Sequence, residues 1–212
     1  MLFVFTKANA QLLDTIDFSL NKKPKLFFTF ANFNTFIDHQ YANVNGTRLG
    51  VSFNRRVRFG VGFFNLINNS IVTPIHIKES EQEYTTDGEL SFSFISFSAE
   101  YFYYNKYPWQ FGVMPWNIGI GEAHYDYIKR PEGHRVSTEH ETIILYQPEL
   151  SGQFSIFRWI GIGSAVGYRV ILYREHQVTH DLNAPMFSVD VRLFLDEIYD
   201  ILFKKDAAVE EN

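Results

Sequence analysis

The residues best suited to chemistry are His124, Asp126, Ser137 and His140, which lie close together in one polar stretch of the chain. An imidazole oriented by a carboxylate can act as a general base, so His124 beside Asp126 is the first candidate pair. No hydrolase or acyltransferase motif, nucleotide-binding loop or complete triad accompanies them. The sequence therefore predicts no metal site and no cofactor, and it favours a protein without catalytic activity while leaving an enzyme open.

Segments with a two-residue alternation must position these side chains. Such alternation indicates β-strands, and helical periodicity is nearly absent. The expected strands are Lys25–Ile37, Gly46–Asn54, Val57–Leu66, Leu90–Tyr104, Trp109–Gly121, Thr142–Phe157, Trp159–Leu172 and Ala184–Leu195. Their connections are short at "NRR", at "NKYP" and near Arg158, and long and polar elsewhere. An even number of strands, with the short turns and both termini on one side, predicts an all-β, eight-stranded antiparallel up-and-down barrel.

The two faces of these strands distinguish a membrane barrel from a soluble one. In "WIGIGSAVGYRV", large apolar residues such as Ile162 and Val166 alternate with small residues such as Gly163 and Ala165. A soluble lipocalin-like barrel would carry Lys, Glu and Asp on its outward face, but here the second face holds mainly Gly, Ser, Asn and Gln. The pattern favours lipid outside and small residues inside, and a soluble ligand-binding barrel stays as the last alternative.

The composition excludes other classes of protein. The formal net charge is -5 and no basic stripe stands out, so we expect no nucleic-acid partner. The absence of cysteine excludes a disulfide framework. No apolar run approaches the roughly 18 residues of a transmembrane helix.

The first ten residues end in Ala8-Asn9-Ala10 before Gln11, which has the small-x-small form of a signal-peptidase site. The apolar part is short and a basic start is missing, so we expect either a truncated signal peptide over residues 1–10 or an ordinary N-terminal segment.

Aromatic residues gather at the predicted strand ends. Tyr101, Tyr103 and Trp109 flank one short turn, and Trp159 follows another. These positions suit an interfacial girdle, although aromatic residues also favour strands in general.

Charged residues on the inward parity should fill the lumen. A charge in a narrow dehydrated lumen is costly unless it is paired, so the sequence predicts a salt-bridge network that plugs the barrel. Counting from the turn near Arg158 predicts that Glu149 meets Arg169 on the neighbouring strand. The network comprises Arg48, Arg58, Glu100, Glu149, Arg169, Asp190 and Arg192.

Two prolines interrupt neighbouring strands, Pro115 in "WQFGVMPWNIGIG" and Pro148 in "LYQPELSG". Proline cannot donate to a β-ladder, so the pair predicts a locally weakened seam in the wall. The seam is either a pair of β-bulges that adjust curvature or a lateral entrance for a lipid chain.

These segments resemble small outer-membrane barrels of the OmpA/OmpX type, and the "ANAQ" end resembles signal ends of exported proteins of the Bacteroidota. The resemblance implies a Gram-negative outer-membrane protein with a barrel over residues 25–195. It also implies a periplasmic N-terminal segment over residues 11–24, and a periplasmic amphipathic segment with an acidic tail over residues 196–212. The expected role is structural or partner-binding, with outer-membrane lipids including lipopolysaccharide, and other envelope proteins, as partners. The alternative is a lipid A-modifying enzyme, by resemblance to barrels of the lipid A palmitoyltransferase kind, with access at the Pro115/Pro148 seam.

Overall fold

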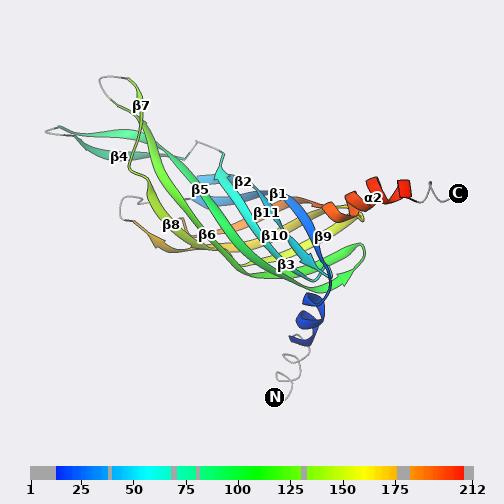
Figure 1. Ribbon diagram of the computed structural model, residues 1–212. Coiled ribbons are helices and arrows are strands. Elements are labelled where there is room, and N and C mark those ends of the chain that lie inside the picture. Colours follow the sequence, from blue (N-terminus) through cyan, green and yellow to red (C-terminus); the bar gives the residue numbers. More distant parts are fainter. Residues whose placement is uncertain are drawn as a thin grey trace, which may run out of the picture.

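A computed structural model describes residues 13–37, 40–67, 71–79, 82–129, 133–175 and 182–207. Its strands form one antiparallel sheet that closes into a barrel, and one helix lies near each terminus of the chain (Figure 1). The elements are β1 (Pro24–Ile37), β2 (Gln40–Phe53), β3 (Val57–Leu66), β4 (Val72–Glu79), β5 (Gln82–Lys106), β6 (Trp109–Ile128), β7 (Arg135–Ser137), β8 (Glu141–Tyr146), β9 (Glu149–Phe157), β10 (Ile160–Arg174), β11 (Ala184–Phe194) and α2 (Leu195–Ala207).

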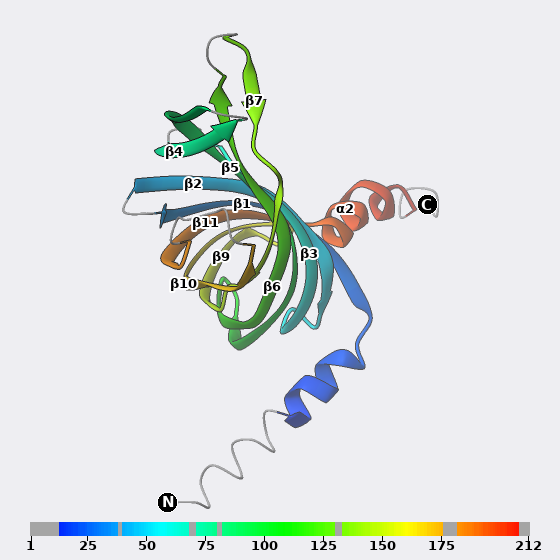
Figure 2. The ribbon, with the colours of Figure 1, turned by 90° about the vertical axis from the view of Figure 1, so that its left-hand side faces the viewer.

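The barrel wall runs β1-β2-β3-β5-β6, then β8 and β9 end to end, then β10-β11 and back to β1. Closure of this ring is seen when the barrel is viewed from its end (Figure 2). The predicted eight-stranded antiparallel barrel is therefore confirmed, with β8 and β9 together forming one of the predicted strands.

Several strands are longer than the sequence predicted. β2 begins at Gln40 instead of Gly46, β5 begins at Gln82 instead of Leu90, and β6 continues to Ile128 instead of Gly121. The added parts of β5 and β6 are polar and lie beyond the apolar part of the wall, where no two-sided alternation marks a strand. The added part of β2 pairs with β1 within the wall, and its Ala42 and Val44 point into the core. Together with β4 and β7, which the sequence placed in loops, the outer parts of β5 and β6 build a sheet ordered β4-β5-β6-β7 that projects from the end opposite the termini (Figures 1 and 2).

The short turns lie where the sequence placed them. The turn between β2 and β3 holds Asn54 and Arg55 at φ of 50° and 54°, and the Arg56 amide donates to the Phe53 carbonyl at 2.9 Å. Positive φ at both central positions is the geometry of a tight hairpin turn, and asparagine tolerates it well.

The outward face is apolar around the wall, as predicted. Phe63, Phe97 and Val166 are about half exposed, whereas their strand neighbours point into the lumen. The first strand has phenylalanine on both parities, and it turns Phe27 and Phe33 inward and Phe30 and Phe36 outward.

The upper lumen is an apolar core and not a space filled by small residues. Phe33, Phe64, Phe92 and Phe94 are buried there, and the Phe64 and Phe94 rings stack at 5.1 Å. The apolar parity of β5 changes near Phe94, although the register of the strand is continuous there. The parity changes because phenylalanine enters the lumen.

Helices flank the barrel at the end that carries the short turns. One covers residues 13–20, within the segment expected at 11–24, and α2 begins at Leu195, directly after the last strand. Glu197 fixes the start of α2, because it accepts from Lys25 at 2.7 Å and from Arg55 at 3.1 Å. Among the described residues, neither helix is long and apolar enough to cross a membrane.

Candidate functional site

The seven charged residues predicted for the lumen are all buried in it. Arg58, 1% exposed, lies lowest, toward the short turns, with its guanidinium carbon 4.2 Å from the centre of the Phe102 ring. Its nitrogens donate to Gln110 at 2.9 Å and to Gln153 at 3.0 Å. Arginine is the cation best able to combine ring contact with several directed hydrogen bonds in a dry site.

Glu100 is the shared anion of this lower layer. Its Oε2 lies 3.5 Å from Arg58 and 3.4 Å from Arg192, and its Oε1 accepts from Ser151 at 2.7 Å. Gln153 connects the same two arginines, because its Oε1 accepts from Arg58 and also from Arg192 at 2.8 Å. One carboxylate and one amide thus connect two buried arginines from opposite sides of the barrel.

The middle of the lumen holds Arg48, Glu149 and Asp190. Asp190 lies 3.6 Å from Arg192, and Glu149 accepts from the Asn117 amide at 2.8 Å. Arg48 lies over the Phe64 ring at 5.7 Å, where the charged layer meets the apolar core. The lumen is therefore filled in two layers, charged below and apolar above.

The predicted ion pair between Glu149 and Arg169 is absent from the described residues. Glu149 pairs in register with Gly167, which leaves Arg169 two positions further along β10. There the guanidinium lies 5.4 Å from the Phe92 ring and beside the side-chain oxygen of Gln147. Counting pairing steps placed the two residues on one face, but the aromatic core offered Arg169 a nearer partner.

Neutral residues of the network were missed because only charges were sought. Gln110, Asn117, Ser151 and Gln153 supply hydrogen bonds to the buried ions. They share the inward parity of the charged residues, and this shared parity is the signal that could have found them.

The proline seam coincides with the break between β8 and β9. The ladder of β6 with β9 ends at Met114 and Glu149, and the ladder with β8 resumes at Ile118. Between them, residues 115–117 of β6 face residues 147–148, which is a bulge of three residues against two. The ladder of the wall is thus interrupted beside the two prolines.

A groove of about 450 Å³ opens outward over this seam. Pro115, Pro148, Leu150, Val166 and Tyr168 line it, so its surface is mostly apolar. The Tyr146 hydroxyl donates to the Pro115 carbonyl at 2.7 Å and partly closes the gap in the ladder.

The candidate catalytic residues come together, but away from the seam. The rings of His124 and His140 stack at 4.2 Å, and His124 Nε2 lies 3.7 Å from Asp126 Oδ1. They lie on the outward face of β6 beyond the apolar wall, and His124 is nine positions from Pro115, about 30 Å along the strand.

Asp126 is bound into the projecting sheet. It accepts from Ser137 at 2.5 Å and from Arg135 at 3.1 Å. Burial raises the pKa of Asp126, but the hydrogen bond from Ser137 and the nearby His124 and Arg135 outweigh it and hold the pKa below its usual value. A carboxylate kept ionised by its neighbours in this way orients β7 against β6.

The aromatic residues proposed as interfacial anchors lie beside the short turns. Tyr103 and Trp109 are exposed, whereas Tyr101 and Trp159 are half-buried. Trp109 stacks on Phe111 with ring centres 5.9 Å apart. An exposed aromatic row at this level suits the boundary between lipid and water.

No protein-family model matches the chain. No curated protein matches it either.

Solved structures do match the fold. Neisserial surface protein A, NspA, has a TM-score of 0.53 at 13% identity, over 81% of this chain and 96% of that chain. The N-terminal β-barrel domain of Pseudomonas aeruginosa OprF gives 0.48 at 9% identity, over 81% and 98%, and Ail of Yersinia pestis gives 0.47 at 12%, over 80% and 97%. The chain thus shares the fold of a small eight-stranded outer-membrane β-barrel, and its apolar outward wall suits a surrounding of lipid.

Proposed function

We propose that this barrel has a structural or partner-binding role in the envelope and that its charge network plugs the lumen. On this proposal its partners are outer-membrane lipids, including lipopolysaccharide, and other envelope proteins. The Ala8-Asn9-Ala10-Gln11 sequence, outside the described residues, supports a source among the Bacteroidota.

The observation that carries the proposal is the contact across the lumen. Arg58 on β3 and Glu100 on β5 meet Arg192 on β11 and Gln153 on β9, so the side chains connect opposite walls of the ring. An eight-stranded barrel is just wide enough for its own side chains, so contacts that span its lumen support a plug. A closed lumen supports a role at the surface of the barrel and its ends.

The projecting sheet supports the partner-binding part of the proposal. It extends the wall well beyond the apolar belt and presents charged residues such as Glu89, Glu122 and Arg135. Arg135 is already paired with Glu89 at 2.6 Å, so as a contact to lipopolysaccharide phosphate it would have to exchange partners.

Conductance in planar lipid bilayers tests the plug. We expect no stable current steps from the wild-type protein, and current steps from the double variant Arg58→Ser, Arg192→Ser, in which the bridging groups are removed. The variant Arg135→Ser, outside the barrel, is the matched control and should stay closed. Steady wild-type conductance, or a double variant that remains closed, would contradict a plug made by these charges.

The second candidate is a lipid A-modifying enzyme with lateral access at the seam. The groove over Pro115 and Pro148 favours it, because an apolar groove over an interrupted ladder could admit an acyl chain. Its weakness is the distance to His124 and Asp126, which lie about 30 Å further along β6.

Mass spectrometry of lipid A from cells with and without the protein tests this second candidate. If the seam is a substrate entrance, the protein should change the acylation pattern, and the double variant Pro115→Val, Pro148→Val should abolish the change. Pro185→Val, an exposed proline on β11, is the matched control. An unchanged pattern in every strain would reject the enzyme and leave the prolines as shapers of the wall.

A further inference from the structure

A row of asparagines faces outward through the apolar wall on β1, β2 and β3. Asn32 and Asn34 lie on β1, Asn43 and Asn45 on β2, and Asn65 on β3, all on the parity that points away from the lumen. The register pairs Asn32 with Asn45 and Asn45 with Asn65, so three amides lie side by side across three strands. We call these five residues the asparagine row.

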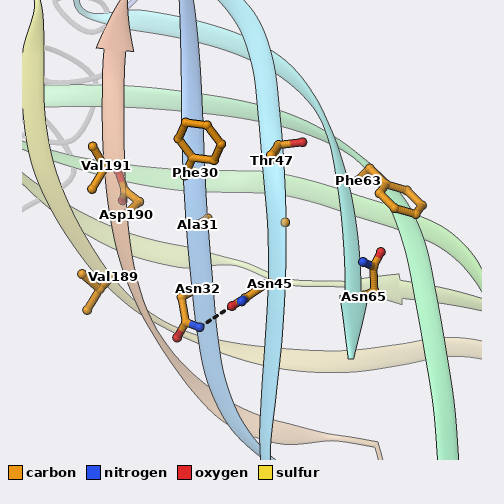
Figure 3. Close-up of a pocket in the computed structure, with 11 residues that line it drawn as sticks. Phe30, Ala31, Asn32, Asn45, Thr47, Phe63, Asn65, Val189, Asp190 and Val191 are labelled. Atoms are coloured by element: carbon orange, nitrogen blue, oxygen red, sulfur yellow. Dashed lines mark hydrogen bonds between the residues drawn. The ribbon is translucent and has the colours of Figure 1, made fainter. Parts of the chain in front are cut away.

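The row is framed by apolar side chains that belong to the membrane-facing wall. Phe30, Leu49 and Phe63 lie below it and are about half exposed, and Phe36 and Tyr41 lie above it with ring centres 6.3 Å apart. Figure 3 shows Asn32 and Asn45 pointing toward each other, one level along the strands from Phe30, Thr47 and Phe63, with Asn65 on the next strand. The asparagine row is thus a polar window inside the apolar belt.

The depth of the window follows from the strand geometry. Asn32 is eight positions above Pro24, at the short-turn end of β1. A rise of about 3.4 Å per residue and a tilt of about 40° place it roughly 20 Å above that end, within an apolar band about 25 Å tall. Asn32 and Asn45 therefore lie at the depth of the outer-leaflet hydrocarbon.

The amides satisfy one another only in part. Asn43 donates to Asn32 and Asn34, both at 3.0 Å, and Asn34 donates to Asn32 at 3.1 Å. Within the described chain, the side-chain NH2 of Asn45 and the whole amide of Asn65 have no hydrogen-bond partner. An amide left unpaired in hydrocarbon is costly, so these groups call for a polar partner from outside the chain.

The chemistry of the window identifies the partner. The outward side chains of β1, β2, β3 and β11 within their described bounds include no charge, so a phosphate group would find no cation there. An amide carries both a donor and an acceptor, so a row of amides is complementary to a copy of itself. A second copy in the same membrane also presents its row at the same depth without any further adjustment.

We propose that the asparagine row is the centre of a symmetric interface with a second copy of this chain. A two-fold axis along the membrane normal places the two rows face to face, and amides bond across it in both directions. The apolar side chains on either side, such as Phe30, Phe63 and Val189, border a groove of about 620 Å³ and surround the polar centre with packing contacts. Side-chain amides that hydrogen-bond between segments contribute to association within membranes.

The first test measures self-association in lipid vesicles. Copies labelled with donor and acceptor fluorophores are reconstituted at falling protein-to-lipid ratios, and energy transfer reports the dimer. We expect the wild type to dimerise and the double variant Asn32→Val, Asn45→Val to weaken the dimer by about tenfold, roughly 1.4 kcal/mol. Ser164→Val, which removes an outward polar group on β10, is the matched control and should dimerise like the wild type.

The second test uses the absence of cysteine in the chain. Thr47→Cys, beside the row, should form a disulfide-linked dimer under mild oxidation, whereas Val166→Cys on the exposed face of β10 should not. A heat-dependent gel shift of each variant shows that it is folded. A wild type that stays monomeric at all ratios, equal cross-linking at both positions, or cross-linking of Thr47→Cys to a different protein would overturn the proposal.

Discussion

Removing the carboxylate of Glu100 should be among the most damaging single changes to the barrel. The carboxylate is 5% exposed and lies 3.5 Å from Arg58 and 3.4 Å from Arg192. At an effective dielectric constant of about 20, each of these pairs is worth roughly 5 kcal/mol before desolvation is counted. The desolvation of three ions offsets much of this gain, so the pairs add little net stability, but their loss leaves the buried Arg58 without an ion-pair partner and Arg192 with Asp190 alone, at 3.6 Å.

We therefore expect Glu100→Ala to lower the free energy of unfolding by about 3–5 kcal/mol, the usual cost of breaking a buried pair. Glu100→Gln keeps the shape and the acceptor for Ser151 and removes only the charge, so it should lose most of the same free energy. Glu122→Gln, on the exposed outer part of β6, is the matched control and should change stability by less than about 0.5 kcal/mol.

The assay is equilibrium unfolding in denaturant, with the protein in lipid vesicles and followed by tryptophan fluorescence, with the heat-dependent gel shift as a second probe. The reasoning would be refuted if Glu100→Ala and Glu100→Gln both unfolded within about 0.5 kcal/mol of the wild type. It would be refuted in its electrostatic part if only the alanine variant were destabilised, because packing would then be the dominant contribution.

Three further outcomes are expected. A methyl group at Gly121 would overlap the carbonyl oxygen of Ser93, so Gly121→Ala should prevent folding or cost more than about 2 kcal/mol in an unfolding titration. At Gly152 the nearest atom is a carbon of the Phe111 ring at 3.3 Å, which needs to move only slightly, so Gly152→Ala should cost much less. Burial raises the pKa of Glu197, but hydrogen bonds and charges from its cationic partners outweigh burial and lower the pKa. The contacts of Glu197 should therefore hold α2 against the barrel above about pH 4.5 and release it as the pH falls through the lowered pKa. Hydrogen exchange of α2, corrected for intrinsic rates, should show this pH dependence, and Glu197→Gln should abolish it. Asp126→Asn should loosen β7 from β6 and speed limited proteolysis of the projecting sheet, while the heat-dependent gel shift of the barrel stays unchanged.

The sequence predicted the barrel well where both faces of a strand have a fixed environment. In β10 every second residue meets lipid and the others meet a crowded lumen, so Ile162 and Val166 alternate with Gly163 and Ala165 as required. Beyond the belt both faces meet water, and this explains why the outer parts of β5 and β6, and all of β4 and β7, carried no readable alternation. The sequence also indicated that the seven charges face the lumen, because alternate side chains of a barrel strand point inward.

Partners inside the lumen could not be predicted, because they depend on the shear of the barrel and on which large side chains occupy it. Arg169 was expected to reach Glu149 and instead lies on Phe92, a residue whose inward facing conflicts with a lumen of small groups. The same ambiguity concealed the asparagine row. Phenylalanine occurs on both faces of β1, so its facing, and with it the direction of Asn32 and Asn34, could be fixed only once Phe33 was found packed in the core.

The two layers of the lumen support the proposal that partners bind at the outward surface. The charged layer connects opposite walls through Arg58, Glu100 and Arg192, and the apolar layer above it is packed with aromatic rings. A wall held from inside in this way can carry a polar outward position without deforming, because its shape does not depend on how well that position is solvated. The asparagine row occurs on this supported wall, and its unpaired amides are tolerable in the apolar belt only if another polar surface meets them there.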